Sequence, residues 1–322
     1  MKKLIIIIGV LLLCGCSSDI KYSKSYFYMD TVINLDIYSN KEDILLEVEN
    51  IYKEYHNLTT RYDNIKDLVN IYYINNILKV NKEIKIDSRL YELLEYSKEV
   101  YIKTNKKVNI GLGNVIDVWN EYKNKIGGIP SYNQLLNSGS TNLDDLVLLG
   151  DNTIKKTSNI KLDLGAISKG YTTNIVKEYL EENNIDKYLI NAGGNVVVGN
   201  HYNNSLYKIG LQDPINNMDV YKVLNLTNKA VVTSGSYIRG YEYEGIVYHH
   251  IIDSIKLFPM NYFKSVTVIC DNSAKADALS TYLFTIPYEE GLNIVESLPG
   301  VEVIWYIDST NIKYTKGVTN YE

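Results

Sequence analysis

The sequence contains few cysteines, and this limits the covalent chemistry open to the chain. Three occur in 322 residues, namely Cys14, Cys16 and Cys270. Because only Cys270 lies beyond Cys16, a disulfide framework within the mature chain is excluded. Cys270 ends an apolar run at 266–269 that is typical of a buried strand. We therefore expect it to be an inert buried thiol and not a nucleophile.

The sequence also lacks an excess of positive charge. The formal net charge is -5, and it becomes -7 when Lys2 and Lys3 are removed with an N-terminal signal. Such a mildly acidic surface does not favour nucleic acid as a partner. The chain also has no internal repeat and no low-complexity tract.

The N-terminal apolar run, Leu4–Leu13, is too short to cross a bilayer, which takes about 20 residues. Two lysines precede it and Cys14-Gly15-Cys16 follows it, which is the layout of a secretory signal. Leu13-Cys14-Gly15-Cys16 also resembles a bacterial lipobox, with a small residue before the modified cysteine. An ordinary signal peptide with two incidental cysteines is the alternative.

We therefore expect three segments along the chain. Residues 1–15 are interpreted as a lipoprotein signal peptide and residues 16–25 as a polar tether that starts at a lipidated Cys16. A domain of residues 26–322 follows. The protein is then expected on the extracytoplasmic face of the cell membrane, held there by its lipid anchor.

The order of the expected elements is mixed, with no regular alternation of strand and helix. We expect helices at 40–58 (capped by Asn40), 88–105, 168–183 and 274–285. We expect strands at 32–38, 161–164, 188–192, 195–198, 206–211, 221–226, 246–252, 265–270 and 301–307. This order favours a single α+β domain over a doubly wound sheet.

The strongest local signal lies at residues 162–171. A short strand carries Asp163, Gly165 permits a tight turn, and a helix follows with Lys169 in its first turn. A helix N-terminus offers free backbone N–H groups and a partial positive charge, and a neighbouring lysine suits a phosphate. An ordinary strand–turn–helix with a solvated lysine is the alternative for this stretch alone.

Two further segments have weaker signals. Asp277 and Thr281 are four residues apart and share one face if they are helical, and their oxygens are ligands that Mg²⁺ accepts. A solvated helix face is the alternative. Gly193 and Gly194 lie between two strands, where paired glycines let a ligand approach the backbone. A plain hairpin turn is the alternative there.

His249 and His250 are two of the four histidines in the chain, and Asp253 follows them. Histidine is the usual proton carrier near neutral pH. Adjacent residues of a strand point to opposite faces, so at most one of the pair is expected to line a given site. A His-x-x-x-His spacing is absent, so zinc is not expected. The phosphate loop of P-loop enzymes and the dinucleotide fingerprint are absent as well.

Taken together and in order, these segments resemble the ApbE family of FAD:protein FMN transferases. The resemblance covers residues 26 to 307. The segments that carry it are Met29-Asp30-Thr31, Arg61-Tyr62-Asp63, Asp163 to Gly170, Ala192-Gly193-Gly194, Thr233-Ser234-Gly235, His249 to Asp253 and Ala276 to Thr281.

The resemblance implies an α+β fold that binds FAD as substrate together with Mg²⁺. It implies metal ligation by the carbonyl of Ala166 and the side chains of Asp277 and Thr281. It also implies that Tyr62 faces the isoalloxazine ring. The FAD-binding residues that it implies are Met29, Tyr62, Asn109, Asp163, Lys169, Gly193, Gly194 and Ile252.

The family reaction transfers FMN from FAD to a threonine or serine of a partner protein and releases AMP. Typical acceptors are flavoprotein subunits of membrane ion-pumping oxidoreductases. For proton transfer, or for orienting the acceptor, the candidate is His250, with Asp253 as the rival base. Two rivals to the transferase remain. One is a Mg²⁺-dependent FAD pyrophosphatase that yields FMN and AMP, and the other is a flavin-binding lipoprotein without chemistry.

The chain departs from the family pattern at three places. Ser254–Phe258 replaces a segment that usually carries Pro, Thr and Gly between Asp253 and Pro259. Ser236 and Asn109 stand where the family often has aspartate. These departures bear on acceptor recognition and transfer efficiency more than on FAD binding.

Overall fold

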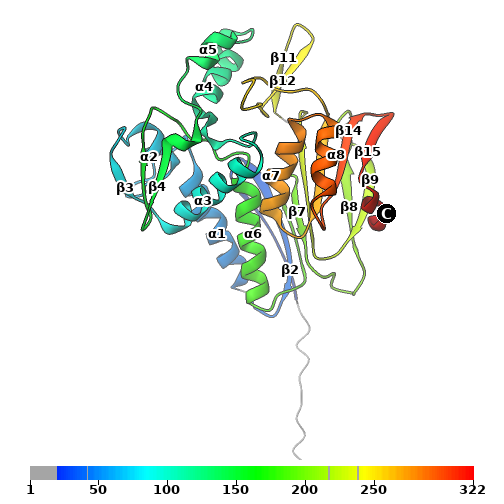
Figure 1. The fold of residues 1–322 in the computed structure, drawn as a ribbon. Helices are drawn as coiled ribbons and strands as arrows, with labels where there is room; N and C mark the ends of the chain where they lie inside the picture. Colours follow the sequence, from blue (N-terminus) through cyan, green and yellow to red (C-terminus); the bar gives the residue numbers. More distant parts are fainter. Residues whose placement is uncertain (1–19, 42, 217, 238) are drawn as a thin grey trace, which may run out of the picture.

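An eight-stranded antiparallel sheet organises the molecule (Figure 1). Its strands run in the spatial order β1-β2-β6-β7-β10-β13-β14-β15. Their bounds are β1 (Ile20–Tyr28), β2 (Thr31–Ser39), β6 (Tyr188–Ala192), β7 (Asn195–Val198), β10 (Lys229–Gly235), β13 (Ser265–Cys270), β14 (Glu302–Asp308) and β15 (Asn311–Tyr314). The computed structural model describes residues 20–41, 43–216, 218–237 and 239–322.

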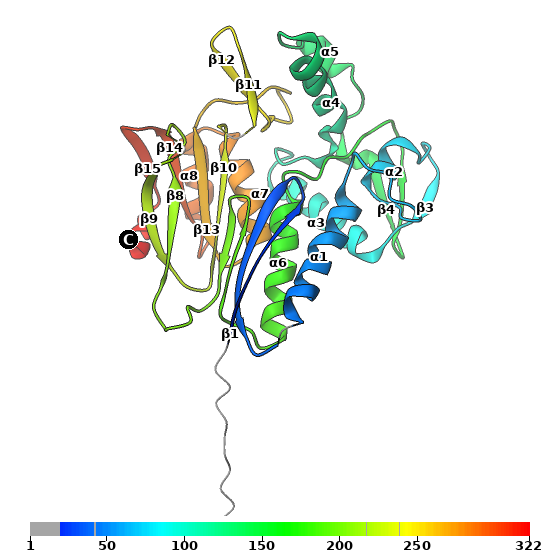
Figure 2. The ribbon, with the colours of Figure 1, turned by 180° about the vertical axis from the view of Figure 1, so that it is seen from behind.

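Helices cover one face of this sheet, and a hairpin covers part of the other (Figure 2). The helices are α1 (Ile44–Thr59), α6 (Ser168–Glu182), α7 (Ser273–Phe284) and α8 (Tyr288–Glu296). The hairpin is β8 (Tyr207–Gln212) with β9 (Val220–Leu226). Strand alternation produces the main core, because Ile33, Leu35 and Ile37 all point inward from β2 and are almost fully buried.

Two smaller regions complete the fold. One contains α2 (Ile71–Asn76), α3 (Ser88–Lys103) and a sheet of β3 (Glu83–Lys85), β5 (Thr153–Lys156) and β4 (Leu146–Gly150). The other contains α4 (Gly113–Glu121), α5 (Tyr132–Leu136) and the hairpin of β11 (Gly240–Tyr243) and β12 (Ile246–His249), at the top of Figure 1. The mixture confirms the predicted α+β class. None of the helices in the described ranges is long and apolar enough to cross a membrane.

The structure corrects the predicted tether. The segment 16–25 was expected to be free of the domain, but residues 20–25 belong to β1, which pairs with β2 along its whole length. Its polar side chains are used in cross-strand contacts, such as Ser23 with Asp36 (2.6 Å) and Ser25 with Asn34 (2.7 Å). The predicted signal peptide and Cys16 lie outside the described residues.

Three predicted element boundaries also change. Residues 161–164 belong to no strand. The N–H and the carbonyl of Leu162 both bond the side-chain amide of Asn75 instead of a neighbouring strand. The first helix begins at Ile44 with Asp43 at its N-cap, so Asn40 does not cap it. The strand expected at 246–252 ends at His249.

Candidate functional site

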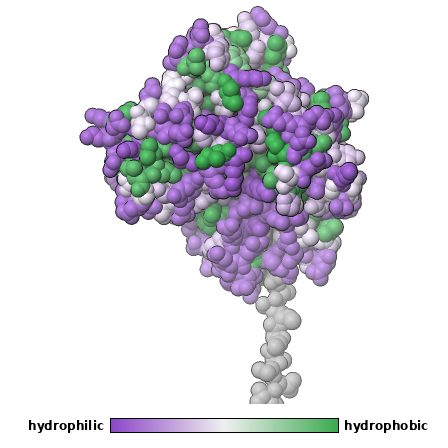
Figure 3. Space-filling model, in the orientation of Figure 1, coloured by the Kyte–Doolittle hydropathy of each residue, from purple (hydrophilic) through white to green (hydrophobic). Residues whose placement is uncertain are grey.

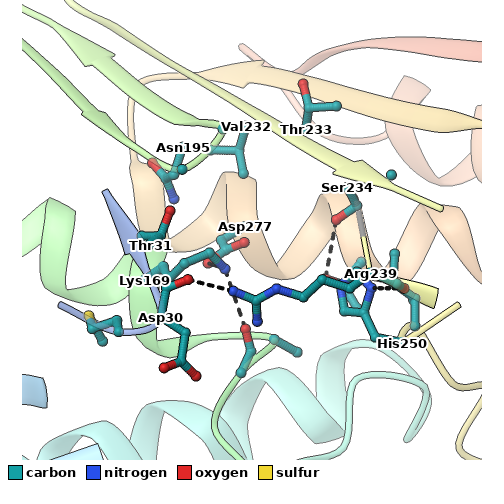
Figure 4. Close-up of a pocket in the computed structure, with 18 of the residues that line it drawn as sticks. Asp30, Thr31, Lys169, Asn195, Val232, Thr233, Ser234, Arg239, His250 and Asp277 are labelled. Carbon is teal, nitrogen blue, oxygen red and sulfur yellow. Dashed lines mark hydrogen bonds and ion pairs between the residues drawn. The ribbon is translucent and has the colours of Figure 1, made fainter. Parts of the chain in front are cut away.

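A cavity of about 1030 Å³ opens where one end of the main sheet meets the start of α6 (Figure 4). Its size is near the upper end of the roughly 300–1,000 Å³ typical of ligand pockets. Its lining includes both Thr233 and Ser234, which point to opposite faces of β10 (Figure 4). The cavity therefore continues from the helix-covered face of the sheet to the face covered by β8 and β9.

Two tight hairpin turns form part of the rim. Met29 and Asp30 connect β1 to β2, and Gly193 and Gly194 connect β6 to β7. All four residues have positive φ, between 55° and 88°, as two-residue turns between twisted strands require. A Cβ on Gly193 would lie 2.0 Å from the Thr31 hydroxyl oxygen, so only glycine fits there. The sequence predicted that a ligand approaches the backbone at Gly193. The group that lies against this glycine is instead the Thr31 side chain of the protein itself.

The loop before α6 places charged groups on the cavity wall. Asp163 accepts a hydrogen bond from the backbone N–H of Gly165 (2.9 Å) and forms an ion pair with Arg61 (2.8 Å). Arg61 also contacts Asp117 (2.5 Å), and its side chain is only 7% exposed. Burial opposes its charge, but the two carboxylates keep the pKa of Arg61 above its usual value. Arg61 therefore fixes the position of Asp163.

Asp277 and Thr281 both line the cavity from α7, as predicted. Asp277 Oδ2 accepts a hydrogen bond from the Gly170 backbone (2.7 Å) and lies 3.8 Å from Lys169 Nζ. A Cβ on Gly170 would lie 2.3 Å from the Cβ of Asp277, so the absence of a side chain lets α6 and α7 touch. In a regular helix the N–H of Gly170 would bond the carbonyl of Ala166, four residues earlier. Here that N–H donates to Asp277 instead.

These groups fit a hard divalent cation. Burial raises the pKa of Asp277, which is only 4% exposed, although the ammonium of Lys169 and the N–H of Gly170 act in the opposite direction. A cation would repay this desolvation. One carboxylate, one hydroxyl and one carbonyl are also the few oxygen ligands that Mg²⁺ takes from a protein when phosphates supply others. Among the described residues there is no cluster of three or more His, Cys, Asp or Glu side chains suited to a metal.

Predicted flavin contacts lie on the adjoining wall. Tyr62 lines the cavity with 62% of its surface exposed, so its ring is free to stack on a planar ligand. Met29 lines the cavity as well, and its N–H donates to Nδ1 of His56 (3.2 Å). Asn109 lines the cavity but bonds the backbone of Gly111 (2.7 Å) and Thr141 (2.8 Å). Its amide therefore shapes the following loop.

The two histidines separate as the alternation predicted. His249 is buried and packs edge-on against Phe284. Its Nε2 donates to the Met260 carbonyl (3.1 Å), and its Nδ1 accepts from the Ile251 N–H (3.2 Å). His250 lines the cavity instead. Its Nδ1 lies 3.1 Å from the Arg239 carbonyl, which can only accept, so Nδ1 carries the proton and Nε2 is left as an acceptor. The ring is open to solvent on its cavity side, but protein atoms on the other sides desolvate it and lower its pKa.

Asp253 does not occupy the position of a base. It is absent from the lining of the cavity and only 1% exposed. Its carboxylate pairs with Lys107 (2.6 Å) and accepts from the backbones of Ile255 and Lys256 (2.8 Å each). Burial alone would raise its pKa, but these donors hold the pKa of Asp253 below its usual value. Its contacts are those of a residue that shapes the 253–258 turn, and its neighbour Ile252 lines the cavity.

That turn explains how the altered segment is tolerated. Leu257 has φ of 62°, a conformation that costs about 1–2 kcal/mol in residues with a Cβ. Leu257 is nevertheless buried at 4% exposure, its carbonyl accepts from the Trp119 indole (3.0 Å), and Phe258 packs edge-on against the same ring. Packing against α4 offsets the backbone strain.

Arg239 is a cavity residue that the sequence motifs missed. Its side chain extends across the cavity, and Nη2 donates to the Asp30 carbonyl at 2.7 Å (Figure 4). The contact joins positions 209 residues apart, so no local pattern signals it. Arg239 is one of several cationic residues that line the cavity, and it and Lys169 both lower the pKa of His250. Cys270, by contrast, is buried as expected, and burial raises the pKa of its thiol.

Comparison with known proteins agrees with this geometry. Residues 29–305 match the model of the ApbE family. The chain is 27% identical over 300 residues to the FAD:protein FMN transferase of Klebsiella pneumoniae, with 90% of each chain covered. It is also 27% identical over 317 residues to the protein of that name in Haemophilus influenzae, with 92% of this chain and 91% of that one covered.

The fold is shared with solved structures. The ApbE protein from Thermotoga maritima superposes with a TM-score of 0.84 at 23% identity, covering 94% of this chain and 99% of that one. The flavin transferase ApbE from Vibrio cholerae gives a TM-score of 0.77 at 19% identity, covering 94% and 100%. With a family model that matches most of its length, the chain belongs to the ApbE family.

Proposed function

We propose that this protein is an FAD:protein FMN transferase that uses Mg²⁺. In the proposed reaction a threonine or serine hydroxyl of a target flavoprotein attacks the FMN-side phosphorus of FAD. A phosphoester bond to that oxygen forms, the P–O–P bond breaks, the hydroxyl proton passes to a base, and AMP leaves.

One observation carries the proposal: Asp277, Thr281 and Lys169 line one cavity that reaches both faces of the sheet, and Lys169 lies 3.8 Å from Asp277. A dinucleotide has two ring systems joined by a pyrophosphate, and its charged centre needs cations. The exposed ring of Tyr62 lies on one arm of the cavity, and the polar Thr233 and Thr267 (2.8 Å apart) lie on the other. The cavity thus offers distinct surroundings for the two halves of FAD.

Mg²⁺ would be held by Asp277, Thr281 and the Ala166 carbonyl, and it would neutralise charge on the pyrophosphate oxygens. Lys169 contributes a positive charge within reach of the same place, since its ammonium is 3.8 Å from Asp277. The hydroxyl of Ser234 on β10 helps to position Thr281, because it lies 2.8 Å from the Ser280 hydroxyl and 3.4 Å from the Thr281 hydroxyl. Arg61 keeps Asp163 on the flavin side.

His250 is the group suited to accept the hydroxyl proton. Its Nδ1 proton is committed to the Arg239 carbonyl, and its lowered pKa keeps Nε2 unprotonated at neutral pH. A positioned base of this kind contributes typically about 10²–10⁴-fold in rate. Asp253, the rival base, contacts Lys107 instead of the cavity.

The partner and the location belong to the same proposal. A lipid anchor at Cys16 would hold the enzyme on the extracytoplasmic face of the cell membrane. Flavoprotein subunits of membrane redox complexes would be its acceptors there. The exposed mouth of the cavity is consistent with a macromolecular acceptor, because a hydroxyl on another protein must enter it.

The test uses the domain without residues 1–16, incubated with FAD and Mg²⁺, with and without a candidate acceptor domain. Mass spectrometry would detect an FMN adduct on the acceptor, and chromatography would detect AMP. We expect an adduct and AMP in equal amounts, both dependent on metal. Omitting Mg²⁺ in the presence of a chelator is the matched control.

Two other results would replace the proposal. FMN and AMP formed at the same rate with and without any acceptor, and never an adduct, would make the protein an FAD pyrophosphatase in which water is the nucleophile. FAD bound and recovered intact under every condition would make it a flavin-binding protein without chemistry.

A further inference from the structure

At the end of the sheet opposite the cavity, aromatic side chains gather beside the start of β1. Tyr38 and Tyr202 stack with ring centroids 4.9 Å apart and planes at 16°. His201 contacts both Tyr202 (4.5 Å) and Tyr207 (4.6 Å). Lys21 is paired with Tyr38 across the β1–β2 ladder. Tyr207 is buried behind the others. We call Lys21, Tyr38, His201 and Tyr202 the aromatic foot.

Much of this surface is left open by the described part of the chain. Tyr202 is 52% exposed, and nearby Ile20 and Leu206 are 56% and 48% exposed. The function proposed above gives none of these residues a role, since none of them lines the cavity. Their chemistry is that of the membrane–water interface, where rings with a polar tip are favoured.

The short segment between Cys16 and β1 limits how far this end of the domain can lie from a lipid anchor. Three residues separate Cys16 from Ile20, where β1 begins. A fully extended chain spans at most about 3.6 Å per residue, so Ile20 lies within about 14 Å of a lipidated Cys16. The polar layer on each side of a bilayer is about 5–7 Å thick. With so short a link, the end of the domain at Ile20 cannot stay clear of the headgroups.

We propose that the aromatic foot rests on the headgroup layer of the membrane and holds the domain upright on it. This inference depends on the lipid anchor at Cys16 proposed above, and not on the chemistry of the cavity. The bottom of the molecule in Figure 3 is largely hydrophilic, which suits contact with headgroups and not insertion into hydrocarbon.

The charges around the foot indicate that the contact is not electrostatic. Lys21 is paired with Asp36 (2.9 Å), and Lys41 bonds the Asn183 carbonyl (3.2 Å). Asp186 accepts from Asn200 (2.9 Å). Lys21 and Asp36 neutralise each other, and Lys41 and Asp186 add one further charge of each sign, so these four groups carry no net charge. They give little attraction to anionic lipid, so the contact should form on zwitterionic lipid as well and should survive salt.

An upright domain fixes the height of the active site. β1 contains nine residues and runs from the foot to the Met29–Asp30 turn at the cavity rim. At about 3.4 Å per residue it is about 30 Å long. The acceptor hydroxyl must therefore be presented about 30 Å above the headgroups. This favours acceptors whose modified loop projects from the membrane over acceptors modified at the bilayer surface.

The experiment uses the full-length lipidated protein in vesicles, with a spin label on a single introduced cysteine. Leu206→Cys places the label at the foot, and Glu242→Cys places it on β11 at the opposite end as the matched control. Cys270 is buried and does not compete for the label. Collision with a water-soluble nickel complex and with oxygen reports whether each label meets lipid or bulk water.

We expect the label at 206 to be protected from nickel and the label at 242 to be fully accessible, in zwitterionic vesicles and at high salt alike. Tyr38→Gln with Tyr202→Gln should abolish the protection at 206, and Tyr202→Gln alone serves if the double variant does not fold. Equal access at both positions would overturn the proposal. So would protection that requires anionic lipid, or release of the protein from the membrane because Cys16 carries no lipid. FMN transfer to a soluble acceptor, measured on the same samples, reports separately on the function.

Discussion

The two walls of the cavity are built in opposite ways. The wall of α6 and α7 is close-packed, with Gly170 lacking a side chain so that Asp277 can bond its backbone. The wall formed by residues 239–258 includes an exposed hairpin, the strained Leu257 and a segment that departs from the family pattern. The first wall holds the groups suited to the metal and pyrophosphate, and the second holds His250 and Arg239. The groups proposed to bind the metal and the pyrophosphate therefore lie on the close-packed wall.

Asp277→Asn should have the largest effect, because it removes the only carboxylate proposed to bind Mg²⁺ while keeping the size of the side chain. We expect FMN transfer to fall by roughly 10²–10³-fold or more. Adduct formation followed by mass spectrometry at several Mg²⁺ concentrations measures it. Thr281→Ser, which keeps a hydroxyl, is the milder companion. Transfer by Asp277→Asn at the parent rate would place the metal elsewhere.

His250→Gln tests the other wall, with an expected loss of about 10²–10⁴-fold if the ring accepts the proton. The active form is the neutral ring, so the rate should be lost as pH falls through the folded-state pKa of His250, which burial lowers to about 4. The parent enzyme should thus keep its rate below pH 6, where an ordinary histidine would already be half protonated.

The pH profile also separates the two candidate bases. His250→Gln should lose the acid limb, whereas Asp253→Asn should keep it and melt at a lower temperature, because it breaks the buried pair with Lys107. An acid limb that disappears in Asp253→Asn and persists in His250→Gln would reverse the assignment.

Gly193→Ala and Gly194→Ala form a matched pair at the rim. Both residues have positive φ, and either change costs about 1–2 kcal/mol of backbone strain. The new Cβ of Gly193→Ala would also lie 2.0 Å from the Thr31 hydroxyl, whereas that of Gly194→Ala would meet nothing closer than 3.8 Å. Overpacking should add about 1–3 kcal/mol for Gly193 alone. Urea unfolding checks this, and equal costs would contradict the close contact.

The smallest expected difference concerns Leu257. Leu257→Ala loses packing on Trp119 and keeps the strained φ, whereas Leu257→Gly loses the same packing and relieves the strain. We expect the glycine variant to be the more stable by about 1–2 kcal/mol, against the usual preference for alanine. Thermal melts of the two variants measure it. If alanine is the more stable, the turn does not hold Leu257 in the left-handed region.

Much of the fold was predictable where side-chain pattern and local structure agree. β6, β7, β13 and α6 were placed within a residue or two, because apolar residues alternate or recur at helical spacing there. β1 was missed since its sequence, IKYSKSYFY, is largely polar. It is held by pairing with β2 and by contacts such as Lys24 with Glu49 (2.9 Å), which no local pattern reveals.

The site shows the same limit. Asp163, Lys169, Asp277, Thr281 and His250 were identified because each stands in a local motif, and all five line the cavity. Arg239 and His56 line it too, but each stands alone in the sequence, and their positions follow from long-range contacts. Asp253 was interpreted as a possible base because sequence proximity to His250 does not reveal the direction of its side chain.

Arg239 makes two independent sets of contacts, one through its main-chain carbonyl and one through its side chain. The main chain accepts from both the N–H and the Nδ1–H of His250 at 3.1 Å, whereas the guanidinium reaches the Asp30 carbonyl. Every amino acid at position 239 supplies this carbonyl, so a substitution there does not change the tautomer of His250. A substitution changes only the charge and the length of the side chain. A substitution at this position would therefore change the charge beside Asp30 without removing the carbonyl that fixes the tautomer of His250.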